Sequence, residues 1–307
     1  MKNLFNKNAV LSIKLISLML LSAIIAGCAG TSPDAQNTIP DQPSMGYEMN
    51  TLPFNEYTVY YRSAGDPQNP CIIFLHPAFG DHTLFNPQFD ALAEDFFLIA
   101  PDMIGHGKTQ PESTKDQLDM TSEHLSAILD KNGLDKCHIM GASLGSLVAQ
   151  DFAAKFPERI LSVTVVGGYS IHKNNKDLQK AQSKEIFSWL PKLLFNMNGF
   201  REYIARQSSY HGSGYDAMLA ASQTFTRKSM MYMQGMNKLF VDREEAVPYP
   251  LLIIYGDHEL EIALEHGKQW VTLEPNARLE IIADAGHCAN MEQPEAFNTI
   301  FREFLDN

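Results

Sequence analysis

Short apolar runs of strand length alternate with helical patterns over most of the chain. The apolar runs are residues 71–75, 97–100, 138–140, 161–166, 251–255 and 279–282, and helices are predicted at 116–132, 144–156 and 294–305. Strands that are apolar on both faces and separated by helices are typical of a parallel sheet covered on both sides. Residues 57–62 and the segment near 47–51 look like an opening hairpin, so the first two strands are predicted to be antiparallel. The sequence therefore predicts an α/β fold with a mostly parallel, eight-stranded sheet.

Length and charge limit the possible functions. A chain of 307 residues with 45% hydrophobic side chains can bury one large core. Its 24 Lys and Arg against 36 Asp and Glu leave no basic stripe for a phosphate backbone, so no nucleic-acid partner is expected. His-Glu-x-x-His does not occur and no cysteine spacing suggests a metal site, so neither a metal nor a cofactor is expected.

The N-terminus resembles an export signal. Three lysines precede an apolar run at 15–26 that is too short to span a bilayer, which is typical of a secretory signal. Residues 25–28 resemble a bacterial lipobox, so 1–27 are predicted to be a lipoprotein signal peptide and Cys28 to carry the membrane-anchoring lipid. The alternative is an ordinary cleaved signal with an incidental cysteine. Residues 28–45 are predicted to be a flexible tether, because they are polar and rich in Pro and Ser. Ala29, where an inner-membrane retention signal would be Asp, favours the bacterial outer membrane on its periplasmic side.

Three cysteines remain after the signal: Cys71, Cys137 and Cys288. The first two lie near the starts of predicted neighbouring strands, where a disulfide is conceivable. Side-by-side parallel strands seldom offer the required bond geometry, so buried thiols are favoured. The sequence does not determine the oligomeric state.

The pattern Gly141-Ala142-Ser143-Leu144-Gly145 follows a predicted strand and opens a predicted helix. In this context G-x-S-x-G is typical of a strained turn that exposes a nucleophilic serine, with small flanking residues that let the backbone double back. The helix N-terminus that follows stabilises developing negative charge. Ser143 is therefore the candidate nucleophile.

A serine nucleophile needs a base and donors for the oxyanion. His287 follows the last predicted strand and precedes the final helix, so it can reach Ser143 from a neighbouring strand end. One oxyanion donor is predicted to be the backbone N–H of Leu144. The second is predicted to come from the loop at 76–81, with Ala78 as the candidate and Phe79 as the alternative, because Pro77 has no N–H.

Several ordered motifs over residues 46–307 resemble the α/β-hydrolase superfamily, close to its carboxylesterase and C–C-bond hydrolase-like members with a cap after the sixth strand. The family's His-Gly-x-x-Gly loop is similar to residues 76–80, its Pro-Asp-x-x-Gly-His-Gly turn to 101–107, and its last signature to Gly286-His287 followed by 292–294. The resemblance implies a core of 46–170 and 248–307, and a helical cap inserted at 171–247.

The triad acid departs from the family pattern, in which an Asp lies three residues after the Gly that ends the seventh strand. Here that register, counted from Gly256, places Glu259 at the position, and Ser-His-Glu triads exist. Asp257 is the alternative acid. The other known location, after the sixth strand at 166–170, offers no carboxylate.

The insertion at 171–247 is long for a simple crossover. It is rich in large apolar residues, mostly aromatic residues and Met: Phe187, Trp189, Leu190, Leu193, Leu194, Phe195, Met197, Phe200, Met218, Phe225, Met230, Met231, Met233 and Met236. These side chains are expected to form the core of a small helical subdomain. They also suit a cap whose Met-rich inner face closes an apolar pocket.

The resemblance implies a serine hydrolase that cleaves an ester or related carbonyl substrate with an apolar part, through an acyl-enzyme on Ser143. The serine excludes relatives that attack with Asp. Ester, thioester, lactone, amide and C–C substrates remain open. The alternative is a catalytically silent lipoprotein of the same fold that binds an apolar ligand or an envelope protein, which the unusual Glu259 and Pro77 suggest.

Overall fold

The computed structural model describes residues 47–113, 115–172 and 188–306, and within them an eight-stranded sheet. The strands are β1 (Glu48–Phe54), β2 (Tyr57–Ala64), β3 (Cys71–Leu75), β4 (Phe97–Pro101), β5 (Cys137–Ala142), β6 (Ile160–Val166), β7 (Leu251–Gly256) and β8 (Ala277–Ile282). They lie in the order β1-β2-β4-β3-β5-β6-β7-β8. Only the β1–β2 and β2–β4 pairs are antiparallel. The predicted fold class and the opening hairpin are confirmed.

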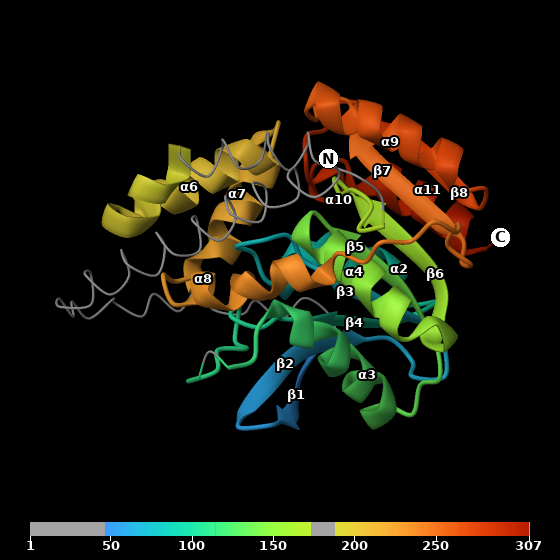
Figure 1. Ribbon diagram of the computed structural model, residues 1–307, viewed down its shortest axis with the longest axis horizontal. Coiled ribbons are helices and arrows are strands. Elements are labelled where there is room, and N and C mark those ends of the chain that lie inside the picture. Colours follow the sequence, from blue (N-terminus) through green and yellow to red (C-terminus); the bar gives the residue numbers. More distant parts are fainter. Residues whose placement is uncertain (1–46, 114, 173–187, 307) are drawn as a thin grey trace, which may run out of the picture.

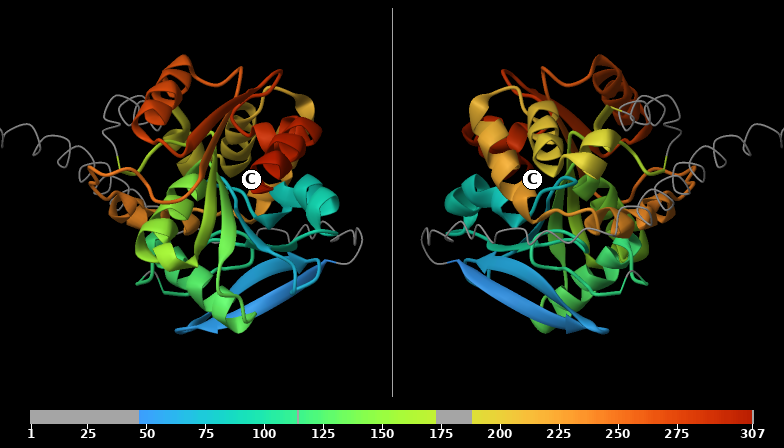
Figure 2. Two further views of the ribbon diagram at one scale, coloured as in Figure 1. Left: turned by 90° about the vertical axis from the view of Figure 1, so that its right-hand side faces the viewer. Right: turned by 90° about the vertical axis from the view of Figure 1, so that its left-hand side faces the viewer.

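Helices cover both faces of the sheet (Figures 1 and 2). They are α2 (Asn86–Leu92), α3 (Thr121–Lys131), α4 (Leu144–Lys155), α9 (Glu261–Leu273), α10 (Ala289–Glu292) and α11 (Pro294–Leu305). One apolar core lies between the sheet and α3, α4 and α9, and a second lies between the sheet and α2 and α11. All five residues of β3 are buried, as expected for a central strand that is covered on both faces.

The register aligns the carboxyl ends of the central strands. Leu75 at the end of β3 pairs with Gly141, and Ala142 at the end of β5 pairs with Val166 at the end of β6. Residues that directly follow these strands therefore meet at one edge of the sheet, which is where open α/β sheets carry their sites.

Helices also occupy most of the described part of the segment between β6 and β7. They are a helix at 188–195, α6 (Met197–Ser208), α7 (Gly212–Ala221) and α8 (Ser229–Tyr232), followed by a 3₁₀ turn at Met233–Leu239. The helices up to α7 enclose a third core around Trp189, Phe200 and Phe225. Tyr232 and Leu239 instead pack into the core between the sheet and α3, α4 and α9. The segment thus contributes to two cores: the core of the sheet, and a third core to which Leu84, Cys288 and Met291 from outside the segment also belong.

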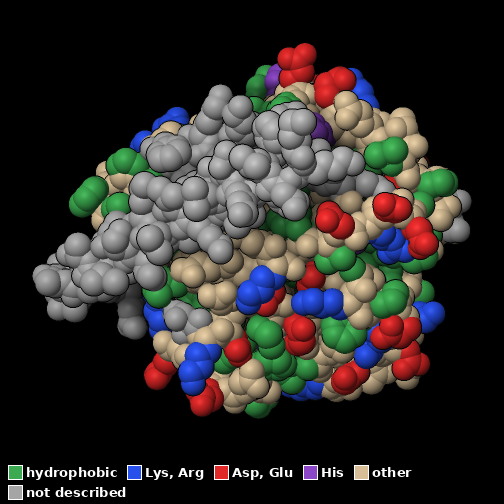
Figure 3. Space-filling model, viewed as in Figure 1, with side chains coloured by type: hydrophobic (Ala, Val, Ile, Leu, Met, Phe, Trp, Pro, Cys, Tyr) green, Lys and Arg blue, Asp and Glu red, His purple; other side chains and the backbone are tan. Residues whose placement is uncertain are grey.

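The predicted signal peptide, Cys28 and the tether lie outside the described residues, as do 173–187 within the insertion. Among the residues that the structure describes, no helix is both long enough and apolar enough to cross a membrane. Cys71, Cys137 and Cys288 are buried free thiols. On the described part of the face in Figure 3, Lys and Arg lie among Asp and Glu.

The turn from β5 into α4 presses the helix onto the end of β3. A Cβ added to Gly145 would lie 2.1 Å from the backbone oxygen of Leu75, and one added to Gly141 would lie 2.2 Å from the oxygen of Gly145. Real Cβ atoms do not approach backbone this closely. Both glycines of the G-x-S-x-G pattern are therefore required, because any side chain at these positions would collide with backbone atoms.

We expect Gly145→Ala to lower the free energy of unfolding by about 3 kcal/mol, because the atom that it meets is backbone and cannot move aside as a flexible side chain can. Gly212→Ala is the matched control, since no heavy atom lies within 4 Å of a Cβ there, and a change within about 0.5 kcal/mol is expected. Urea unfolding of both variants measures the difference. Equal stability of the two would contradict the close approach.

Candidate active site

Ser143 occupies a strained turn between β5 and α4. Its backbone has φ 50° and ψ −114°, a combination that costs energy for a residue with a Cβ and that clusters at functional sites. Its N–H donates to the oxygen of Val166 at 2.8 Å, and its own oxygen accepts from the N–H of Ser146 at 3.0 Å. These bonds hold the turn against the end of β6 and leave the side chain half-buried at the sheet edge.

The first turn of α4 begins at Leu144, which is buried. The first N–H groups of a helix have no partner within the helix, and together with the helix dipole they favour an anion. A Cβ on Gly145 would also lie within 2.8 Å of the oxygen of His76. The N-terminus of α4 therefore lies directly against the loop that follows β3.

His76 anchors that loop through both ring nitrogens. Nε2 accepts the N–H of Met103 at 3.0 Å, so Nδ1 carries the hydrogen and donates to the oxygen of Pro77 at 2.9 Å. The ring is fully buried, and burial lowers the pKa of His76 to about 4. The neutral ring thus ties the 76–80 loop to the turn after β4. In that loop Ala78 and Phe79 are half-buried, and Phe79 has φ 71°.

A second buried contact, between His82 and Asp102, lies just after this loop. His82 Nδ1 lies 2.8 Å from Asp102 Oδ1, and the other carboxylate oxygen accepts the N–H of Lys108 at 2.8 Å. Burial opposes the charge on His82, but the hydrogen bond and charge of Asp102 outweigh it and raise the pKa of His82. The motif at 101–107 predicts only the turn that contains Asp102, and no short motif contains both Asp102 and His82, so the sequence did not point to this pair.

His287 lies beside the end of β6 and meets Glu259. A Cβ on Gly167 would lie 3.0 Å from His287 Nδ1, so the imidazole rests against the residue that follows Val166, to which Ser143 is bonded. Nδ1 is 2.5 Å from Glu259 Oε2, and the Glu259 side chain is only 6% exposed. The structure therefore places Ser143, His287 and Glu259 after the ends of β5, β8 and β7, and it brings Glu259 into contact with His287.

The environment of Glu259 favours its carboxylate. Burial alone would raise the pKa of Glu259, but the charge of His287 and its hydrogen bond outweigh burial and hold the pKa below its usual value. Oε1 accepts the N–H of Leu260 at 2.9 Å. One oxygen thus serves the backbone, and the other faces the imidazole.

Asp257, the alternative acid, has a different role in the structure. Its Oδ1 accepts the N–H of Ala285 at 3.2 Å, and its side chain is 40% exposed. Backbone donors at Asp284 and then Ala285 hold the pKa of Asp257 below its usual value. The carboxylate therefore fastens the loop that leads to His287, and Glu259 is the one that meets the ring.

Phe79 joins the 76–80 loop to the insertion. Its ring meets Phe225 at 4.9 Å, Phe200 at 5.2 Å and Trp189 at 6.0 Å between centroids, each with the edge-to-face geometry that aromatic pairs favour. Phe200 and Phe225 are fully buried. A residue of the candidate oxyanion loop thus completes the aromatic core of the insertion.

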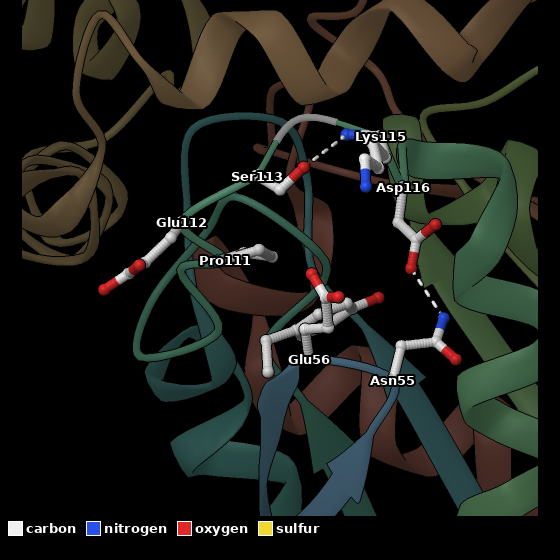
Figure 4. A pocket seen from close by; sticks show the side chains of 8 residues that line it. Asn55, Glu56, Pro111, Glu112, Ser113, Lys115 and Asp116 are labelled. Carbon is white, nitrogen blue, oxygen red and sulfur yellow. Dashed lines mark hydrogen bonds between the residues drawn. The ribbon is translucent and has the colours of Figure 1, made fainter.

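A pocket also opens elsewhere, between the β1–β2 turn and the loop at 111–116 (Figure 4). Most of its described lining residues are polar, and they include Asn55, whose Nδ2 donates to Asp116 at 2.7 Å. Ser143, Glu259 and His287 are not among the described residues that line it. Among the residues that the structure describes, no group of three or more His, Cys, Asp or Glu could hold a metal ion.

The family model of the alpha/beta hydrolase fold matches residues 70–294. The chain belongs to this family. The match spans the strand-to-helix turn, the 76–80 loop and both loops that carry the charged site residues.

Individual relatives are distant. The alpha/beta hydrolase chain is 26% identical over 255 residues to the dihydrolipoyllysine-residue acetyltransferase component of an acetoin cleaving system from Cupriavidus necator, covering 80% of this chain and 66% of that protein. It is 24% identical over 258 residues to carboxylesterase YbfK from Bacillus subtilis, covering 79% of this chain and 82% of that protein. A thermophilic esterase from Thermogutta terrifontis superposes with a TM-score of 0.72 at 19% identity, covering 84% of this chain and 98% of that one. The last likeness shows the fold alone.

We expect Phe79→Ala to lower the free energy of unfolding by about 2–3 kcal/mol, somewhat less than for a fully buried Phe, because it removes three aromatic contacts. Phe195→Ala is the matched control, since Phe195 lies in the insertion that Phe79 contacts and is 85% exposed; a change within about 0.5 kcal/mol is expected. Urea unfolding measures both variants. A loss at Phe195 as large as at Phe79 would show that the contacts with the insertion contribute nothing specific.

Proposed function

We propose that the protein is a carboxylesterase-like serine hydrolase that forms an acyl-enzyme on Ser143. The observation that carries the proposal is the 2.5 Å contact between Glu259 and His287, at the sheet edge where a serine with positive φ opens a helix. A nucleophile, a base and a group that orients the base are what covalent acyl transfer requires.

In the proposed reaction, Ser143 Oγ attacks the substrate carbonyl while His287 Nε2 takes its proton. The carboxylate of Glu259 stabilises the imidazolium and holds the ring with Nε2 toward the serine. The backbone N–H groups of Leu144 and Ala78, or Phe79 in place of Ala78, donate to the oxyanion. His287 then protonates the leaving group, the acyl-enzyme forms, and water activated by the same imidazole releases the acid. No cofactor enters these steps.

The insertion supports an apolar part in the substrate. Its aromatic core reaches the 76–80 loop through Phe79, so apolar side chains adjoin the proposed oxyanion donors. Such surfaces suit the carbon chain or ring of an ester. We propose a small-molecule carbonyl substrate on this basis, with the insertion acting as a cap. The likeness to a carboxylesterase points in the same direction.

We also propose that the hydrolase is a lipoprotein of the bacterial envelope, anchored through Cys28 at the periplasmic side of the outer membrane. This proposal rests on residues 1–45 of the sequence alone, with Ala29 as the sorting residue. A tether of this length would let the catalytic domain act close to the membrane surface.

The labelling experiment that tests the nucleophile uses a fluorophosphonate probe, read by intact mass and peptide mapping. The full chain is expected to gain one probe on Ser143, and Ser143→Ala to gain none. Ser146→Ala is the matched control, because Ser146 lies one turn further along α4 and its Oγ donates to the backbone oxygen of Ser143. A folded wild-type protein that gains no probe would favour the catalytically silent alternative.

The triad acid is tested by two carboxyl-to-amide changes. We expect Glu259→Gln to lower kcat by about 10²–10⁴-fold on p-nitrophenyl esters, because the base loses its orienting charge. Asp257→Asn is expected to change kcat by less than about threefold, because the amide oxygen can still accept the Ala285 N–H.

The pH profile of kcat/KM provides a second test of the triad acid. The Glu259 carboxylate favours protonated His287, so its removal lets the imidazole lose its proton at lower pH. The acidic limb of the kcat/KM profile is therefore expected to move to lower pH in Glu259→Gln and to stay in place in Asp257→Asn. The reverse ranking of the two variants would make Asp257 the acid.

A further inference from the structure

Glu292, at the end of α10, is 7% exposed and accepts hydrogen bonds from two separate parts of the chain. Its Oε2 accepts the N–H of Gly286 at 2.6 Å. Its Oε1 accepts the N–H of Tyr210 at 2.6 Å and also that of His211. One carboxylate thus joins the residue before His287 to the link between α6 and α7 of the insertion.

Packing does not explain the choice of a carboxylate here. All three groups that bond to Glu292 are donors, and within the described residues no Lys, Arg or His is paired with it. Burying an acid is costly unless hydrogen bonds compensate it. A neutral amide would fill the same space but would turn an NH₂ group toward at least one of these donors. The two equivalent oxygens of a carboxylate are what allow both sides to be bonded at once.

The surroundings of Glu292 are shaped for this contact on both sides. A Cβ on Gly286 would lie 3.0 Å from Glu292 Oε2 and 3.0 Å from the nitrogen of Tyr210. A Cβ on Gly214 in α7 would lie 2.7 Å from Glu292 Cγ. Glycine on the His287 loop and glycine on the insertion both let the backbone approach the carboxylate.

The 210–211 segment continues the connection to the loops of the proposed triad. The Tyr210 ring stacks on His258 at 3.6 Å with 10° between planes, and His258 directly precedes Glu259. His211 Nε2 lies 3.1 Å from a side-chain oxygen of Asp284, in the loop that leads to His287. Two adjacent residues of the insertion therefore contact both the loop that carries Glu259 and the loop that carries His287.

We propose that Glu292 is a positioning residue: by fixing the Gly286 N–H, it holds the His287 ring in the correct position relative to Glu259 and Ser143. Through the same carboxylate, the position of the ring depends on how the insertion packs. The inference rests on the proposed function, because it concerns the geometry of the same base. A misplacement of a catalytic group by about 1 Å can cost about 10²-fold in rate. Moving the Gly286 nitrogen from its acceptor would displace the neighbouring imidazole by a distance of that order.

The test compares Glu292→Gln with Glu295→Gln, the same change three residues further on at an exposed position of α11. In Glu292→Gln we expect kcat on p-nitrophenyl esters to fall by about 10–100-fold while KM changes by less than about threefold. The rate of fluorophosphonate labelling should fall in parallel. Glu295→Gln should match the wild type in all three. Kinetics are measured at 25 °C, and the Tm of each variant is measured separately to establish that it is folded at that temperature.

A second pair of variants moves Glu292 without changing its charge. Gly214→Ala adds a methyl group against Glu292 Cγ, whereas Gly212→Ala in the same helix meets nothing within 4 Å. Gly214→Ala should lower kcat by about 3–10-fold and Gly212→Ala should leave it unchanged. This pair decides the matter if Glu292→Gln does not fold.

The possible results separate the two proposals. Absence of labelling in the wild type would overturn the proposed hydrolase and leave Glu292 without a base to position. Normal labelling of the wild type together with wild-type kcat in folded Glu292→Gln, or in Gly214→Ala where that pair must decide, would overturn the role of Glu292 alone. A lower Tm with unchanged kcat would likewise assign Glu292 to stability only and contradict the inference.

Discussion

The close crossing of α4 over the end of β3 is the constraint on which the site depends. Because Gly145 lets the helix backbone approach the Leu75 oxygen, the N-terminus of α4 meets the loop after β3 without a side chain between them. The same crossing forces Ser143 into a left-handed conformation, since the chain has to reverse within one residue. The strain is borne by the burial of the flanking strand and helix, whose residues form much of the larger core.

The segment between β6 and β7 contacts the site at two opposite sides. Phe79 inserts the 76–80 loop into its aromatic core, and Tyr210 and His211 bond to Glu292 beside the His287 loop. One contact is apolar and the other is a network of charge-assisted hydrogen bonds. The loops on both sides of Ser143 are therefore in direct contact with this segment.

Buried charge near the site is compensated by local partners. Asp102 faces His82, Glu259 faces His287, and Glu292 faces backbone donors. His76 is fully buried and its ring bonds to neutral backbone groups, so the ring stays uncharged and ties two loops together. Each of these groups fixes a loop rather than a helix or strand. This distribution follows from the sheet topology, since loops at the strand ends lack the ladder bonds that hold the sheet.

The amino-acid sequence predicted the strands, the opening hairpin and the strand-to-helix turn at Ser143, because each of these has a local pattern. The resemblance to the family, and no local pattern, pointed to Glu259. Only the tertiary structure decided that the Glu259 carboxylate meets His287 while Asp257 turns to Ala285. It also revealed the His82–Asp102 pair, the aromatic contacts of Phe79 and the bonds of Glu292 to a segment 82 residues away. Such contacts are set by how distant elements pack, and no local pattern encodes the distance between them.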